Sequence, residues 1–158
     1  MPTSLPQTSL DFDLVLPSLI AVNQKQLLRS LAQEISGVIG IGERILNDRL
    51  VEKEKESPSA MGEGLSILHL HISGLKQPFS MFARLKNGIP MSAPDNKDVD
   101  LVCVLLTPER EGAAYLRTMA RISRLLRDAQ ICVRLRSTQD EKAIRAILEA
   151  PPVQRIAA

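Results

Sequence analysis

The chain has 158 residues, enough for one domain with a hydrophobic core. Apolar residues make up 44% of it, charged residues 24%, and the net charge is +2, a balance that is ordinary for a globular protein and does not indicate nucleic acid as a partner. Aromatic residues make up only 3%, with no Trp, so the chain lacks the stacking platforms of single-strand binders.

The sequence also argues against export and against membrane insertion. No basic segment followed by an apolar run stands at the N-terminus, and no apolar stretch is long enough to span a bilayer. Cys103 and Cys132 lie inside apolar segments far apart in the chain, which is typical of reduced core thiols. We therefore expect a cytoplasmic protein with no membrane partner and no cofactor.

The first third of the chain predicts a loose arm and two helices. Residues 1–13 are polar and form the arm, and an apolar run at 19–22, after Pro17, is either a brief strand or a packed connector. Asn23 can cap a helix that Gly37 ends. A second helix starts near Gly42, turns Ile45, Leu46 and Leu50 inward, and ends in the charged run 52–56, which we interpret as solvated.

The middle of the chain predicts a loop and three strands. Pro58 and two glycines make 57–64 a loop, and the run 65–72 reads as a strand with both histidines on one face. A second strand covers 79–85 and ends at an Asn-Gly turn. The nearly continuous apolar run 99–106 predicts a central strand that is covered on both faces.

The last third predicts three helices. Thr107-Pro108-Glu109 has the composition of a helix start, and the helix that follows would bury Leu116, Met119, Ala120, Ser123 and Leu126. Asp128 caps a short helix, and a capping box beginning at Thr138 opens the last one. We expect a single α/β domain at 14–150, a small mixed sheet flanked by helices on both faces, with a tail at 151–158.

Three blocks carry a resemblance to a known family. They are Gly62-Glu63-Gly64-Leu65-Ser66-Ile67-Leu68-His69, then Ala93-Pro94-Asp95-Asn96-Lys97-Asp98-Val99-Asp100-Leu101-Val102, then the segment 115–128 with Arg134-Leu135-Arg136. Over most of its length the chain resembles the enzyme IIA domain of the bacterial phosphoenolpyruvate-dependent phosphotransferase system, of the fructose/mannitol type. Within that type it is most similar to the nitrogen-regulatory IIA proteins.

The resemblance implies that His69 accepts a phosphoryl group from a small histidine phosphocarrier protein and that the phosphorylation state controls regulatory partner proteins. It implies that Lys53 and Tyr115 belong to the catalytic site and that the phosphate lies against Ser59, Gly62 and Gly64. His71 is a neighbour of His69 and a secondary candidate, which could stand in for the second histidine that the family usually has.

The site departs from the family pattern at four positions, which leaves alternatives open. The family usually has Arg at Lys53, His at Tyr115 and Pro at Leu68, and its loop has no residue like Pro58, which lacks an N–H donor. The first alternative is therefore a IIA-like binding module that regulates partners without efficient phosphotransfer. A minor alternative is a metal-binding module built on the His-x-His pair of His69 and His71.

Overall fold

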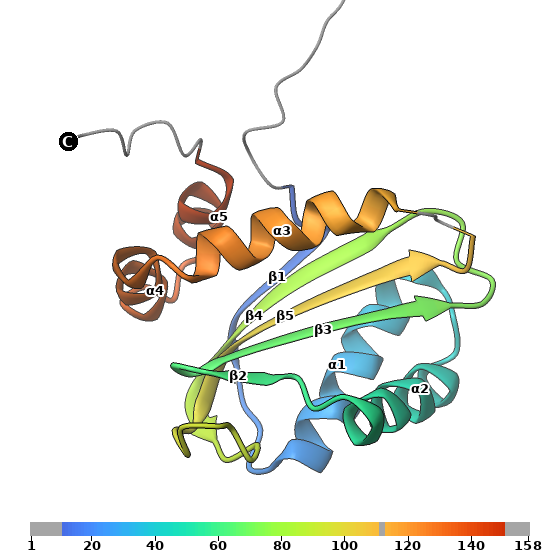
Figure 1. The fold of residues 1–158 in the computed structure, drawn as a ribbon, viewed down its shortest axis with the longest axis horizontal. Helices are drawn as coiled ribbons and strands as arrows, with labels where there is room; N and C mark the ends of the chain where they lie inside the picture. Colours follow the sequence, from blue (N-terminus) through green and yellow to red (C-terminus); the bar gives the residue numbers. More distant parts are fainter. Residues whose placement is uncertain (1–10, 111–112, 151–158) are drawn as a thin grey trace, which may run out of the picture.

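The computed structural model describes residues 11–110 and 113–150, which form a single α/β domain with a mixed sheet between two helical layers (Figure 1). This confirms the predicted fold class. The elements are, in order, β1 (Leu14–Leu19), α1 (Gln24–Ile39), α2 (Glu43–Glu56), β2 (Ala60–Gly62), β3 (Leu65–Ile72), β4 (Phe79–Ile89), β5 (Val99–Pro108), α3 (Ala114–Leu126), α4 (Ala129–Arg136) and α5 (Glu141–Glu149). The predicted tail at 151–158 lies outside the described residues.

The five strands lie in the order β1-β4-β5-β3-β2. The pairs β1–β4 and β3–β5 are parallel, whereas β4–β5 and β2–β3 are antiparallel. The central strand is β5, and its run from Val102 to Leu106 is almost completely buried, as its continuous apolar sequence predicts. One hydrophobic cluster fills the space between the sheet and α1–α2, and a second fills the space between the sheet and α3–α5.

Three predicted loops or connectors differ from the structure. The run 14–19, and not 19–22, is a strand; it contains Pro17, whose missing N–H is tolerated because β1 is an edge strand. The segment 57–64 is not wholly irregular, since Ala60–Gly62 pairs with β3. Strand β4 runs through Asn87-Gly88, where we predicted a turn, and absorbs the pair in an irregular register between Arg84 and Ile89.

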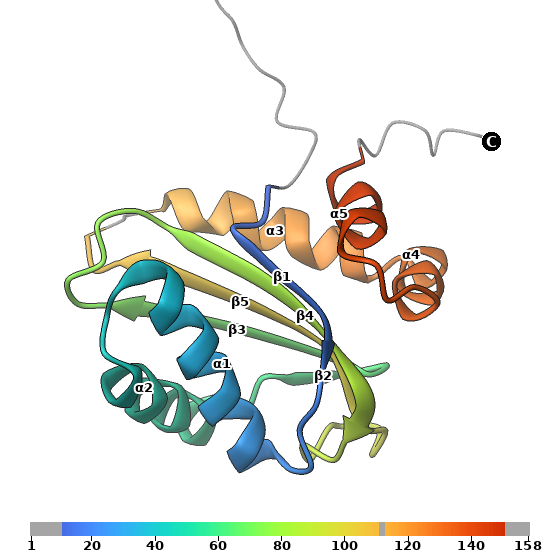
Figure 2. The ribbon, with the colours of Figure 1, turned by 180° about the vertical axis from the view of Figure 1, so that it is seen from behind.

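Helices α1 and α2 cover one face of the sheet (Figure 2). Asn23 caps α1 as predicted, its side chain accepting a hydrogen bond from the Gln26 N–H. The helix ends at Gly40 and not at Gly37. Gly40 has a φ of 78°, the left-handed conformation that commonly ends a helix, whereas Gly37 keeps a helical backbone, which a single glycine tolerates at little cost. In α2, Leu46 and Leu50 are buried, but Ile45 is 59% exposed, so its predicted inward position is wrong.

Helices α3, α4 and α5 cover the other face (Figure 1). Helix α3 begins at Ala114, because Thr107 and Pro108 extend β5 instead of starting a helix. Its buried side chains include Ile122 and Leu126, whereas Leu116 and Ala120 are exposed, contrary to the prediction. Asp128 caps α4 as predicted, but the N-cap of α5 is Asp140 and not Thr138.

The end of the predicted arm belongs to the domain. Phe12 is 5% exposed and packs edge-on against Phe82, with 6.4 Å between ring centroids. Arg145 of α5 donates a hydrogen bond to the Phe12 carbonyl at 2.7 Å, and Asp13 exchanges two hydrogen bonds with Ser80. Phe12 and Asp13, which the prediction placed in the arm, therefore pack against the domain, and residues 1–10 lie outside the described part.

Candidate functional site

Two histidines and a threonine meet at the ends of β3 and β5. The parallel register pairs His71 with Thr107, and the alternation of β3 puts His69 on the same face of the sheet, toward α3. The Thr107 hydroxyl oxygen lies 3.1 Å from His69 Nε2 and 2.7 Å from His71 Nδ1. Thr107 is fully buried, so these rings are its polar neighbours in place of water.

Tyr115, in the first turn of α3, holds the His69 ring from the other side. The Tyr115 and His69 rings are stacked, with centroids 4.3 Å apart and planes 17° apart. His71 approaches both rings edge-on, at 5.1 Å from His69 and 5.5 Å from Tyr115. The structure thus brings together His69, His71 and Tyr115, all three of which the sequence analysis singled out.

His69 borders a cavity of about 280 Å³ between the C-terminal end of α2, the segment that leads into β2, and α3. Lys53 and Ser59 also line this cavity, with Met119 and Ser123 on the α3 side. Lys53 is half-buried and is the one Lys or Arg side chain among the lining residues that the structure describes. The cavity has room for a phosphoryl group beside an imidazole and one cation.

The surroundings of His69 keep its imidazole neutral. Burial, the nearby His71 and the positive charge of Lys53 together lower the pKa of His69 from 6.5 to about 4. The neutral form therefore dominates near pH 7, and it has a ring nitrogen with a free lone pair.

We expect an NMR titration of the His69 ring to show a midpoint near pH 4. Lys53→Gln removes a positive charge and should raise this midpoint, whereas Lys142→Gln on exposed α5 should leave it unchanged. Because the folded pKa lies below the unfolded value of 6.5, the contribution of His69 to stability is complete above about pH 7 and is lost as the pH falls toward 4. A midpoint at or above 6.5 would contradict the assigned surroundings.

Ser59, a predicted phosphate ligand, is engaged in a buried polar cluster. Its hydroxyl donates to Glu54 Oε2 and lies 2.7 Å from the Ser66 hydroxyl. Gln24 donates to the other Glu54 oxygen at 3.0 Å. Glu54 is 9% exposed, so our interpretation of the whole run 52–56 as solvated is wrong at this residue.

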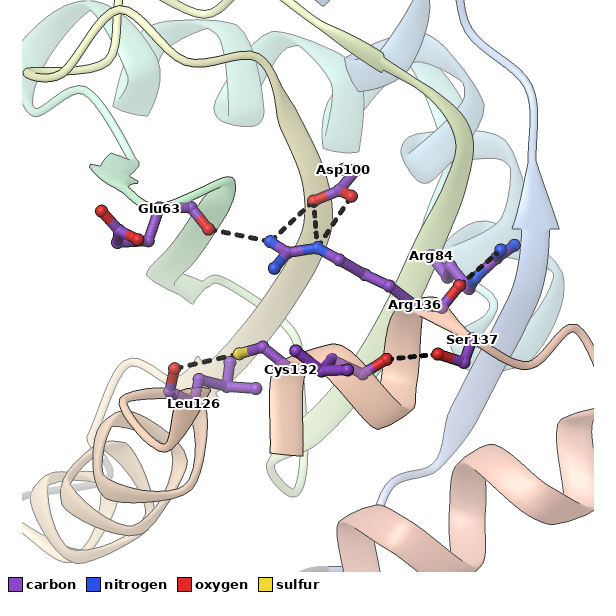
Figure 3. Close-up of polar contacts among 8 residues, drawn as sticks. Glu63, Arg84, Asp100, Leu126, Cys132, Arg136 and Ser137 are labelled. Carbon is purple, nitrogen blue, oxygen red and sulfur yellow. Dashed lines mark hydrogen bonds and ion pairs between the residues drawn. The ribbon is translucent and has the colours of Figure 1, made fainter. Parts of the chain in front are cut away.

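Gly62 and Gly64 do not line the cavity beside His69. Gly62, with φ of 100°, lies against the Asp95 carboxylate. Gly64, with φ of 80°, lies against a network that joins β5, α4 and the turn between β2 and β3 (Figure 3). There Arg136 donates to both Asp100 oxygens, at 2.9 Å for the closest contacts, and to the Glu63 carbonyl at 2.8 Å.

Two site residues escaped the sequence analysis. Thr107 resembled a helix cap, and only the register between β3 and β5 reveals that it faces His71. Glu54 stood in a run of alternating charges; its helical spacing from Leu46 and Leu50 was a usable signal of its inward position. The metal-binding alternative gains no support, since no group of three or more His, Cys, Asp or Glu suited to a metal ion occurs in the described ranges.

Sequence comparison identifies the class of protein to which this α/β fold belongs. The family described as phosphoenolpyruvate-dependent sugar phosphotransferase system, EIIA 2, matches residues 9–150. The chain belongs to this family of phosphotransferase components, as the resemblance of the three sequence blocks implied.

Similar proteins come from several bacteria. A nitrogen regulatory protein of Bradyrhizobium diazoefficiens is 40% identical over 138 residues, covering 87% of this chain and 90% of its own. The crystal structure of nitrogen regulatory protein IIA-Ntr from Neisseria meningitidis superimposes with a TM-score of 0.79 at 24% identity, covering 85% of this chain and 92% of its own. Mannitol IIA from Escherichia coli has the same fold, with a TM-score of 0.69 at 14% identity over 92% of this chain and 99% of its own. Within the described residues, no helix combines the length and apolarity that a membrane crossing requires.

Proposed function

We propose that this protein is a cytoplasmic regulatory phosphocarrier that accepts a phosphoryl group on His69 from a histidine phosphocarrier protein. The observation that supports this most is the neutral His69 imidazole at the edge of a cavity that Lys53 also lines. A nucleophile needs its lone pair, and a phosphoryl group needs a cation beside its oxygens. Both are present within one small cavity.

The transfer exchanges one nitrogen–phosphorus bond for another. A His69 ring nitrogen attacks phosphorus as the bond from phosphorus to the donor's imidazole breaks, and the donor's imidazole leaves. The Lys53 ammonium stabilises the negative charge on the equatorial oxygens during this exchange. The stacked Tyr115 ring keeps the imidazole plane fixed while it reacts.

Thr107 controls which nitrogen of His69 carries the proton. A hydroxyl has one hydrogen, so it donates to one imidazole and accepts from the other. When His69 Nε2 donates to Thr107 and Thr107 donates to His71 Nδ1, the lone pair of His69 Nδ1 is free to attack. After transfer, the same chain of hydrogen bonds leads the proton of the charged His69 ring toward His71.

The downstream role is regulatory. The nitrogen regulatory protein of Bradyrhizobium diazoefficiens covers almost all of this chain at 40% identity, which supports a similar role here. We propose that partner proteins distinguish phosphorylated from unphosphorylated His69. The mannitol IIA of Escherichia coli is known in complex with phosphorylated enzyme IIB of the mannitol system, and it has the same fold. A IIA domain of this shape can therefore present its site to another protein.

One observation favours the second candidate, a binding module with weak phosphotransfer. The Ser59 hydroxyl is bound to Glu54 and Ser66, and Pro58 has no N–H to offer. The segment beside His69 thus provides few free donors for phosphoryl oxygens. On this reading the partners recognise the unphosphorylated surface.

A double substitution separates the two candidates. Lys53→Arg supplies a planar fork for two phosphoryl oxygens, and Tyr115→His places a further imidazole next to His69, in addition to that of His71. If the site is a weakened phosphocarrier, the double variant should take up phosphoryl groups about tenfold faster than the wild type, the effect of one improved charged contact. The measurement is the added phosphoryl mass after incubation with phosphoenolpyruvate, enzyme I and the histidine phosphocarrier protein.

Lys142→Arg in exposed α5 is the control for a Lys-to-Arg exchange away from the cavity. A wild type without detectable phosphate, and a double variant without gain, would support the binding module instead, provided that a IIA protein with the usual site is labelled in parallel.

A further inference from the structure

A second cavity lies in the other helical layer, between the first half of α1, helix α2 and residues 91–92. Its volume is about 410 Å³. This is within the range of small-molecule sites, about 300–1,000 Å³. Apolar side chains supply much of its wall, among them Leu28, Val51, Pro58 and Met91. The cavity adjoins the one beside His69, but His69, Lys53 and Ser59 do not line it.

The rim of this cavity is basic. Lys25, Arg29 and Lys55 line it, and all three side chains are exposed. Within the part of the chain that the structure describes, none of them has an ion-pair partner. The one acid in the wall, Glu54, already accepts hydrogen bonds from Gln24 and Ser59. The rim therefore favours an anion that can lie across three cations.

The wall also holds a carboxylate without a cationic partner. Glu54, which lines the cavity from α2, is 9% exposed, and among the described residues it has the neutral hydrogen-bond partners Gln24 and Ser59 but no ion pair. A buried carboxylate is costly without a cation beside it, so a ligand that brings an ammonium group gains affinity there. This feature is independent of the basic rim, and it favours a hydrogen-bond donor on the ligand in addition to its anionic group.

We propose that this cavity binds a small organic carboxylate that carries an apolar body and a hydrogen-bond donor, such as an apolar α-amino acid. The carboxylate lies against Lys25, Arg29 and Lys55. The apolar body packs on Leu28, Val51 and Met91. The donor, an ammonium group in an α-amino acid, meets the Glu54 carboxylate.

The cavity shares parts of its wall with the His69 cavity, so a ligand bound in it changes the wall beside His69. Pro58 lines both cavities. Glu54 lines the second cavity and holds the hydroxyl of Ser59, which lines the first. A bound ammonium that competes for Glu54 shifts Ser59 and with it the wall beside His69. This coupling regulates phosphoryl uptake only if the proposed function holds, but binding and the shift of Ser59 do not depend on it.

Three probes of matched shape test the proposal by backbone amide NMR on the full chain. L-phenylalanine has both the carboxylate and the donor, 3-phenylpropionate lacks the donor, and 2-phenylethylamine lacks the carboxylate. We expect saturable shifts at Leu28, Val51 and Met91, with L-phenylalanine binding about tenfold more tightly than either partial probe. The absence of saturable shifts, or equal binding of 2-phenylethylamine, would overturn the proposal.

Charge variants complete the test. The double variant Arg29→Gln with Lys55→Gln should weaken binding about tenfold, whereas Arg117→Gln on the exposed side of α3 should not change it. Equal affinity of the double variant would refute the basic rim as the binding element. The coupling predicts a shift of the Ser59 amide on binding, and an unmoved Ser59 amide would refute it. Because His69→Ala leaves this cavity intact, binding to that variant can be measured even if the wild type never accepts phosphate.

Discussion

His69→Ala is expected to reduce phosphoryl uptake to the background seen without enzyme I. The substitution removes the only group in the cavity that the proposal gives a nucleophilic role, so no slower route on the same residue remains. The phosphate on the wild type should be labile in acid, as a phosphorus–nitrogen bond to imidazole is. The measurement is the protein mass before and after incubation with the phosphate donors.

His71→Ala is the matched variant for this result. It removes the other imidazole and the 2.7 Å contact with Thr107, yet leaves His69, Lys53 and Tyr115 in place. We expect this variant to accept phosphate, but more slowly. Since His69 is only half-buried, His69→Ala should retain the backbone NMR spectrum of a folded domain. If phosphate persisted in a folded His69→Ala variant and disappeared in His71→Ala, His71 and not His69 would be the phosphoryl acceptor.

Gly64→Ala is expected to lower the free energy of unfolding by about 2–4 kcal/mol. The φ of Gly64 is 80°, which is costly for alanine, and the new Cβ would lie 2.8 Å from Asp100 Oδ1 and still closer to Arg136 Nη2. The Arg136 side chain cannot simply move aside, because Asp100 and the Glu63 carbonyl hold its guanidinium (Figure 3). The substitution therefore separates the start of β5 from the end of α4. The measurement is chemical denaturation.

Gly74→Ala provides the control for backbone strain alone. Its φ is 88°, but no atom lies within 4 Å of the added Cβ. We expect a loss of only about 1 kcal/mol, the cost of a left-handed alanine. The difference between the two variants isolates the contribution of the Arg136 network. Equal losses of unfolding free energy at Gly64 and Gly74 would show that the Arg136 network rearranges around the added Cβ without cost. Gly64→Ala protein that remains folded should accept phosphate at the wild-type rate if Gly64 holds no phosphate.

The elements with strong local patterns could be predicted from the sequence. The alternation of 65–72 placed both histidines on one face, and the continuous apolar run of β5 indicated a central strand. Asn23 and Asp128 cap their helices as predicted, because capping depends on residues within one turn. In each case the signal and the structure involve the same few residues.

The features that escaped prediction depend on contacts between distant residues. Thr107 touches His71 because β3 and β5 pair in one particular register, and no local pattern fixes that register. Glu54 is buried because Gln24 and Ser59 satisfy it, and neither lies in its own helix. Gly62 and Gly64 have positive φ values and form the tight turn between β2 and β3. The contact with phosphate that the family resemblance implies for them stays a prediction.

The hydrogen bond from Arg145 to the Phe12 carbonyl has a consequence for synthesis of the chain. It joins residues 133 positions apart, near the two ends of the described chain. On the ribosome, the N-terminal edge strand is made first, but its partner β4 follows much later and α5 comes last. Edge strand β1 therefore stays unpaired until β4 has been made, and the segment before it is fixed only when α5 has formed. The domain closes only after α5 has been translated.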